Sequence, residues 1–193
     1  YAYPYLPPIT LAAAPGQTPT ASSVTFSGTK GWILRGVSLS PSYGPTPTVG
    51  NIVLVDKSSA RVTVEDSQLF SVADSSAWGA AEWIDVASSG MFLRGPDCVA
   101  RNNTLTNVRF GISVEGKGVL VERNSIVNFS ADGLRGLGDD GVYQYNVIKN
   151  VYVSQEDGDD NHDDGFQSWS VGAGGVGTGV VKNVTLRGNV FIN

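Results

Sequence analysis

The chain has 193 residues, a formal net charge of −5 at neutral pH and only 16% charged residues. The negative charge argues against general nucleic-acid binding, and no apolar run reaches the ~20 residues that a membrane span needs. Glycine and β-branched residues are abundant, and no segment has the composition of a long helix, so the sequence predicts an all-β domain.

Residues 1–23 are rich in Pro, Ala and Tyr and show neither a strand period nor a helix period. This composition is typical of an arm, a linker or an attachment segment. We therefore expect an N-terminal extended arm over 1–23 and one repetitive domain over 24–193. Because the chain begins at Tyr1, we expect a processed product or a fragment.

A sequence repeat runs through the second half of the chain. Four segments align on Asn103, Asn124, Asn146 and Asn189, whose positions differ by 21, 22 and 43, and 43 is two periods. Weaker copies lie upstream at 32–40 and 62–70. The leucine framework of a leucine-rich repeat is missing, so a parallel β-helix of about 21–22 residues per coil explains the period better.

Stacked coils place equivalent residues directly above one another. We therefore expect the four aligned asparagines to form a ladder of side-chain hydrogen bonds at a turn. The single cysteine, Cys98, stands among apolar residues, which indicates a small buried side chain rather than a nucleophile.

A second alignment predicts strands on another face of the helix. The segments "FGISVEG" (110–116), "DGLRGLG" (132–138) and "DGFQSWS" (164–170) match, and ten extra residues precede the third. Together with the segment 83–88, these strands predict an outward polar column on one sheet. Its members are expected to be Asp85, Ser113, Arg135 and Gln167. The column is either a carbohydrate site or a solvated face with a surface Arg–Asp pair.

The ten extra residues form an acidic loop around His162, the only histidine of the chain. Crowded carboxylates repel one another, so a counter-charge is expected beside them. Oxygen ligands at every second position suit Ca²⁺, although the spacing is not that of an EF-hand. The predicted ligands are Asp157, Asp159, Asn161 and Asp163. His162 itself is either a general base or a solvent-exposed side chain.

Asp132 and Asp164 precede two aligned glycines in neighbouring coils. They are either turn residues that cap backbone amides or a carboxylate pair of the kind used in glycoside hydrolysis. Tyr143 and Trp169 lie near the same turns, where Tyr143 can act as an acid, a base or a substrate contact and Trp169 can stack on a sugar ring.

The Asn-marked coils resemble the right-handed parallel β-helix repeat superfamily. That group includes polysaccharide lyases, alginate C5-epimerases, pectin-type hydrolases and phage tailspikes. The resemblance covers residues 24–193 and implies a right-handed coil. The epimerase signature Asp-Pro-His is not complete here, because "DDNHDDG" supplies His162 without the proline.

Two functions follow from the resemblance and the residues. The first is an extracellular protein that processes or binds an acidic polysaccharide, by lyase- or epimerase-type proton abstraction or by acid-assisted hydrolysis. The catalytic candidates are His162, Asp164, Asp132 and Arg135, and the substrate-binding candidates are Gln167, Asp85, Trp169 and Tyr143.

The alternative is a non-catalytic module of a phage tailspike, a fibre or a surface adhesin, located at a cell surface or on a virion. The last segment, "LRGNVFIN", stops inside a coil pattern. An unpaired sheet edge invites association. We therefore expect either further chain beyond Asn193 or a homo-oligomer, a trimer or a stacked assembly, that covers this edge.

Overall fold

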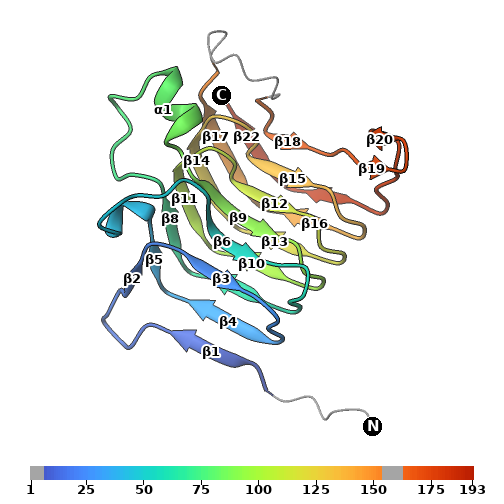
Figure 1. Ribbon diagram of the computed structural model, residues 1–193. Helices are drawn as coiled ribbons and strands as arrows, with labels where there is room; N and C mark the ends of the chain where they lie inside the picture. The colour runs from blue at the N-terminus through green and yellow to red at the C-terminus, as the bar shows by residue number, and fades with distance from the viewer. Residues whose placement is uncertain (1–6, 154–162) are drawn as a thin grey trace.

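The computed structural model describes residues 7–153 and 163–193, which form a stack of short strands that rises from β1 to β22 (Figure 1). Three parallel sheets run along the stack. Sheet A contains β1 (Ile9–Ala12), β4 (Trp32–Arg35), β7 (Thr63–Glu65), β10 (Val99–Arg101), β13 (Leu120–Glu122), β16 (Val142–Gln144) and β21 (Thr185–Arg187). Sheet B contains β2 (Thr20–Ala21), β5 (Ser38–Leu39), β8 (Gln68–Phe70), β11 (Thr104–Val108), β14 (Ser125–Phe129), β17 (Val147–Val151) and β22 (Val190–Ile192).

Sheet C lies on the third side of the stack. It contains β3 (Val24–Phe26), β6 (Asn51–Val55), β9 (Ser89–Leu93), β12 (Ile112–Val114), β15 (Leu134–Gly136) and β18 (Phe166–Gln167). The remaining elements in the described ranges are a short 3-10 helix, η1 (Pro41–Tyr43), a helix, α1 (Ala80–Asp85), and an antiparallel pair, β19 (Val171–Gly172) with β20 (Gly175–Val176). No helix in these ranges is long and apolar enough to cross a membrane.

The strand register confirms the predicted parallel β-helix. Val99 pairs with Leu120, and Leu120 pairs with Val142, so neighbouring coils are offset by the period that the asparagines predict. Alternate residues of each strand point inward and form one continuous apolar core, in which Cys98 is fully buried as expected.

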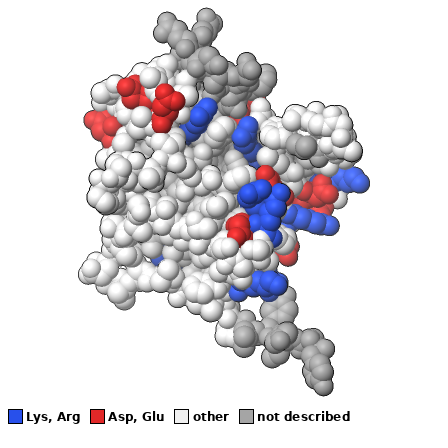
Figure 2. All heavy atoms as spheres, viewed as in Figure 1, with Lys and Arg blue, Asp and Glu red and all other residues white. Residues whose placement is uncertain are grey.

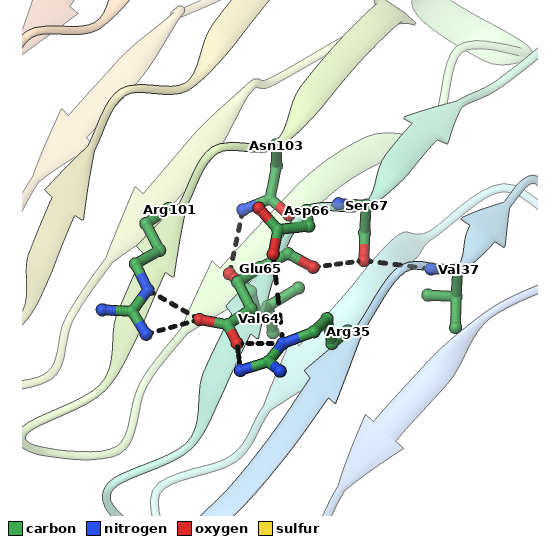
Figure 3. Close-up of polar contacts among 8 residues, drawn as sticks. All are labelled: Arg35, Val37, Val64, Glu65, Asp66, Ser67, Arg101 and Asn103. Atoms are coloured by element: carbon green, nitrogen blue, oxygen red, sulfur yellow. Dashed lines mark hydrogen bonds and ion pairs between the residues drawn. The ribbon is translucent and has the colours of Figure 1, made fainter. Parts of the chain in front are cut away.

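The asparagine ladder is confirmed. The amide nitrogen of Asn103 donates to Asn124 Oδ1 at 3.0 Å, and the same bond joins Asn124 to Asn146 at 3.0 Å and Asn146 to Asn189 at 2.9 Å. Ser67 extends the ladder below, because its backbone N–H donates to Asn103 Oδ1 at 3.1 Å (Figure 3). These buried side chains satisfy backbone groups of adjacent coils and so fix the coil register.

A second ladder stands where sheet B ends. Asn128 donates to Asn107 and Asn150 donates to Asn128, both at 3.1 Å. All three have a backbone φ between 54° and 61°, the left-handed conformation that Asn adopts more easily than most residues. The asparagine that closes each repeat therefore has a structural role of its own.

The boundary expected at residue 23 does not match the strand pairing. β1 pairs in parallel with β4, and β2 pairs in parallel with β5, so parts of the expected arm extend sheets A and B (Figure 1). Pairing of this kind uses backbone groups alone, and it is open to a segment whose composition shows no repeat.

Three insertions leave the helix at the same turn, between sheets B and C. The first includes η1, the second includes α1, and the third joins β17 to β18 and contains the acidic segment. Residues 154–162 of this third insertion lie outside the described residues. As predicted, the acidic segment interrupts one coil between two of its strands.

Candidate functional site

The predicted polar column on sheet C is present for three of its four members. Ser113 pairs with Arg135, and Arg135 pairs with Gln167, in successive strands. Asp85 is not in the column, so this prediction was wrong: it is the last residue of α1, and Phe92 holds the position beside Ser113. The segment 80–85 forms a helix because it belongs to the insertion and not to a coil.

Arg135 lies at the centre of a group that we call the Arg135 cluster. Its members are Phe110, Asp132, Arg135, Gln167 and Trp169. The guanidinium carbon lies 4.2 Å from the centre of the Phe110 ring and 5.8 Å from that of Trp169. Arg135 Nη2 donates to Gln167 Oε1 at 3.2 Å, and Trp169 Nε1 donates to the same oxygen at 3.1 Å. The cluster therefore joins planar cationic and aromatic groups from three successive coils.

Asp132 forms the floor of the cluster. Its side chain is fully buried, with Oδ2 2.6 Å from Arg135 Nε and Oδ1 accepting from the backbone N–H of Asp164 at 3.3 Å. Burial raises the pKa of Asp132 to about 6, the Asp164 charge adds to this rise, and the Arg135 charge opposes it. The carboxylate thus caps a backbone amide, as one of the two predicted roles requires.

The glycines at the start of strands β12, β15 and β18 are required by close packing. A Cβ on Gly111 would stand 2.2 Å from the carbonyl oxygen of Gly133, and a Cβ on Gly133 would stand 2.5 Å from Ile148 Cγ2. Each of these strands therefore follows a glycine, and the residue before that glycine is held at a fixed place. Phe110, Asp132 and Asp164 occupy this place in three successive coils.

Tyr143 is not a surface residue, so its prediction as a substrate contact was wrong. The alternation of β16 points Tyr143 into the core, where it is fully buried and its ring packs edge-on to Phe166 at 5.2 Å. Its hydroxyl donates to the carbonyl of Arg135 at 3.4 Å, and burial raises its pKa above the ordinary tyrosine range. Tyr143 therefore supports the Arg135 strand from within.

Four of the eight predicted calcium ligands and catalytic residues lie outside the described residues: His162, Asp157, Asp159 and Asn161. Asp163 lines a cavity of about 240 Å³, and Asp164 is exposed. Within the described ranges, no three His, Cys, Asp or Glu side chains come together as a metal site would require. The calcium site remains a prediction.

Sequence reasoning missed several aromatic and basic residues of the same face. The guanidinium of Arg94 lies 5.1 Å from the Phe92 ring centre, and that of Arg109 lies 5.8 Å from the Phe110 ring centre. The signal for Phe110 was present, because "FGISVEG" places it in register with Asp132 and Asp164. Figure 2 shows that large parts of the visible surface carry no charge and that Lys and Arg gather in its right half.

The aromatic side chains of the insertions pack mainly against one another. Trp83, the buried residue of α1, stacks on Tyr152 at 5.5 Å and meets Trp78 edge-on at 4.9 Å. Trp83 is thus a packing residue. Trp169 is the tryptophan that joins the Arg135 cluster.

Comparison with known proteins yields a structural likeness. No protein-family model matches the chain, and no curated protein matches it in sequence. A solved structure of a mutant tailspike protein of E. coli bacteriophage HK620, in complex with a pentasaccharide, superposes with a TM-score of 0.63 at 10% sequence identity. The superposition covers 92% of this chain and 29% of the tailspike chain. At this identity the likeness shows the fold, a right-handed parallel β-helix.

Proposed function

We propose that the protein binds an acidic glycan along the outer face of sheet C, with the Arg135 cluster at the centre of the site. The observation that carries the proposal is the side-chain arrangement of Arg135. Its guanidinium lies over the Phe110 ring, with 19% of the side chain exposed, and the Trp169 ring stands beside it.

The chemistry of the cluster suits a carboxylate-bearing sugar. A guanidinium presents planar N–H donors that match a carboxylate, and aromatic rings offer flat apolar area beside polar groups. The column from Phe92 through Ser113 and Arg135 to Gln167 crosses four successive strands. At the usual strand spacing this length is roughly 15 Å, enough for several sugar units.

The structural likeness supports the same class of ligand. The tailspike of phage HK620 was solved with a pentasaccharide and shares this fold. For the present chain we propose a glycan-binding role at a virion or cell surface, with several copies assembled together. Light scattering on the purified protein tests the assembly, and a monomeric mass would contradict it.

A second candidate function is cleavage of the bound glycan. Asp132 and Asp164 are carboxylates of neighbouring coils in different surroundings, the first buried with a raised pKa and the second exposed. Acid-assisted hydrolysis uses two carboxyl groups in different surroundings, one of which holds a proton while the other is ionised. In this candidate function Asp164 would contact the substrate, since Asp164 is exposed and Asp132 is fully buried. Lyase or epimerase chemistry would instead require His162 as the base.

Cleavage is tested with Asp164→Asn. If hydrolysis occurs, this variant retains glycan binding but no longer releases new reducing ends. If wild-type protein releases no reducing ends and no unsaturated sugar from any bound glycan, the catalytic candidate is wrong and the binding proposal stands alone.

Binding is tested on an array of acidic and neutral polysaccharides. We expect wild-type protein to bind at least one uronic-acid polymer and Arg135→Ala to lose at least about tenfold in affinity. The matched control is Arg187→Ala, which removes an exposed arginine of sheet A and should leave binding unchanged. The proposal is wrong if no glycan binds or if the two variants bind equally.

A further inference from the structure

Asp132 is buried under the residue that is proposed to hold the glycan. None of its side chain is exposed, so a ligand on sheet C cannot touch it. One oxygen lies 2.6 Å from Arg135 Nε, and the other accepts the Asp164 backbone N–H from the next coil. Any effect of Asp132 on a ligand must therefore pass through Arg135.

We propose that Asp132 is a positioning residue that acts on the glycan through Arg135 and couples glycan binding to the uptake of a proton. This inference rests on the proposed function, because it assumes an acidic glycan at Arg135. Its physical basis is the fixed geometry of one buried carboxylate, one guanidinium and a negatively charged ligand on the outer side of that guanidinium.

Few charged groups of the described chain surround Asp132. Arg135 belongs to the same coil, and Asp164 follows in the next coil. In the preceding coil the carbonyl of Arg109 accepts from the N–H of Ala131, while its guanidinium donates to the carbonyl of Ile84 at 3.1 Å. Arg135 is thus the charge in closest contact with the carboxylate.

Arg135 has two contacts besides its ion pair with Asp132. Its guanidinium lies over the Phe110 ring and donates to Gln167, and neither of these partners carries a charge. Protonation of Asp132 therefore removes a negative charge behind the guanidinium and leaves the guanidinium in the site. An acidic ligand then meets a less neutralised cation.

The sign of the coupling follows from linkage. A bound carboxylate close to Asp132 disfavours its ionised form and raises its pKa further. Binding then takes up protons, and by reciprocity the affinity rises as pH falls. The pKa of Asp132 in the free protein is about 6, so the change should occur between about pH 7 and pH 5. We expect a gain on the order of fivefold over that interval.

The test compares wild-type protein with Asp132→Asn, which keeps the side-chain shape and an oxygen acceptor for the Asp164 N–H. Oligogalacturonate is titrated calorimetrically across this interval in the presence of EDTA, and a neutral cello-oligosaccharide is the control probe. Both proteins carry His162→Gln, which removes the only histidine of the chain, because imidazole groups in general titrate in this range. Wild-type affinity for oligogalacturonate should rise as pH falls, and Asp132→Asn should lose most of this rise.

A measurement on the His162→Gln protein, in which Asp132 is intact, keeps the inference testable if Asp132→Asn does not fold. Titrations near pH 6 in buffers of different ionisation enthalpy report proton uptake, which should be positive for oligogalacturonate and near zero for the neutral probe. The inference alone is wrong if both proteins bind with the same pH dependence, or if binding takes up no proton. Absence of binding at every pH would contradict the proposed function, and this inference with it.

Discussion

Sheets A and C each hold a buried carboxylate beside arginine, and the two differ in how fully the charge is compensated. On sheet A, Glu65 is 2% exposed and lies between Arg35 and Arg101 of the coils on either side (Figure 3). Arg35 Nε donates to one of its oxygens at 2.5 Å, and Arg101 Nε donates to the other at 2.6 Å. On sheet C, Asp132 has Arg135 alone as its ion-pair partner in the described residues.

The pKa values move in opposite directions as a result. Burial by itself would raise the pKa of Glu65, but hydrogen bonds and charge from Arg101 and Arg35 together lower it. At Asp132 burial is the larger effect and one arginine does not offset it, so the pKa rises to about 6. Glu65, between two arginines, therefore stabilises the fold in its ionised form. Asp132 has one arginine, which is also the proposed glycan contact, so a bound ligand can change the pKa of Asp132.

The largest loss of stability is expected from a substitution in the uncharged Asn ladder. Asn124 bonds to Asn146, to the carbonyl of Ala100 and to two donors of Asn103, all in the buried turn. Asn124→Ala leaves several of these groups unpaired and should lower the free energy of unfolding by about 3 kcal/mol. Urea denaturation measures the change. Asn150→Gly, which cuts an exposed bond of the second ladder, should cost below about 1 kcal/mol, and equal losses would contradict the ladder's role.

Removal of the compensated carboxylate should have the next largest effect. Glu65→Gln leaves Arg35 and Arg101 facing each other without the charge that joins them, and it should cost about 2 kcal/mol because both arginines can still reach water. Equilibrium unfolding is again the measurement. The matched control is Glu115→Gln on the surface, whose pairs with Lys57 and Arg94 are partly exposed and should contribute below about 1 kcal/mol. A similar loss of unfolding free energy in both variants would show that the buried Glu65 contributes no more than the surface Glu115.

The pH dependence of stability should have opposite signs at the two carboxylates. For Glu65 the lowered pKa adds stability that is present above its ordinary value of 4.5 and is lost as pH falls below it. For Asp132 the native state holds its proton more tightly, so stability falls as pH rises from 3.8 towards about 6. At about 1.36 kcal/mol per pKa unit, the Asp132 contribution is on the order of 3 kcal/mol at most.

Each slope can be isolated by its own variant. Thermal unfolding across this range should show that Asp132→Asn removes the decline towards pH 6 and keeps the loss at acid pH, whereas Glu65→Gln does the reverse. If both variants flatten the same part of the profile, the contrast between the two carboxylates is wrong.

Calcium provides the smallest expected effect. If the segment 157–163 holds Ca²⁺, a tenfold excess over its dissociation constant stabilises the folded protein by about 1.4 kcal/mol. Thermal melting with added Ca²⁺ and with EDTA measures this. Identical melting temperatures would contradict the predicted calcium site and would not bear on the proposal for the Arg135 cluster.

The repeat made the fold predictable, and the same alignment also indicates which side chains point inward. Asn103, Asn124 and Asn146 gave the coil register because one residue type recurs at one turn. Tyr143 was placed wrongly although its coil aligns with Val121, an inward residue. Asp85 could not be placed, because a helix in an insertion leaves no trace in the period of the coils.

The Arg135 cluster was only partly predictable for a related reason. Ser113, Arg135 and Gln167 follow from strand register, which the repeat supplies. The Phe110 contact depends on the long Arg135 side chain, which reaches the ring from the neighbouring coil. The burial of Asp132 depends on how tightly the glycine turns pack. Neither property is contained in the spacing of residues along the chain.

The most direct test of glycan binding on sheet C is a two-dimensional NMR titration of the tryptophan indole N–H signals with oligogalacturonate. The chain has four tryptophans, so only four indole signals have to be assigned. We expect the Trp169 signal to shift on binding while those of Trp32, Trp78 and Trp83 stay in place. Binding that shifts Trp32 on sheet A, or that leaves Trp169 unchanged, would contradict the account.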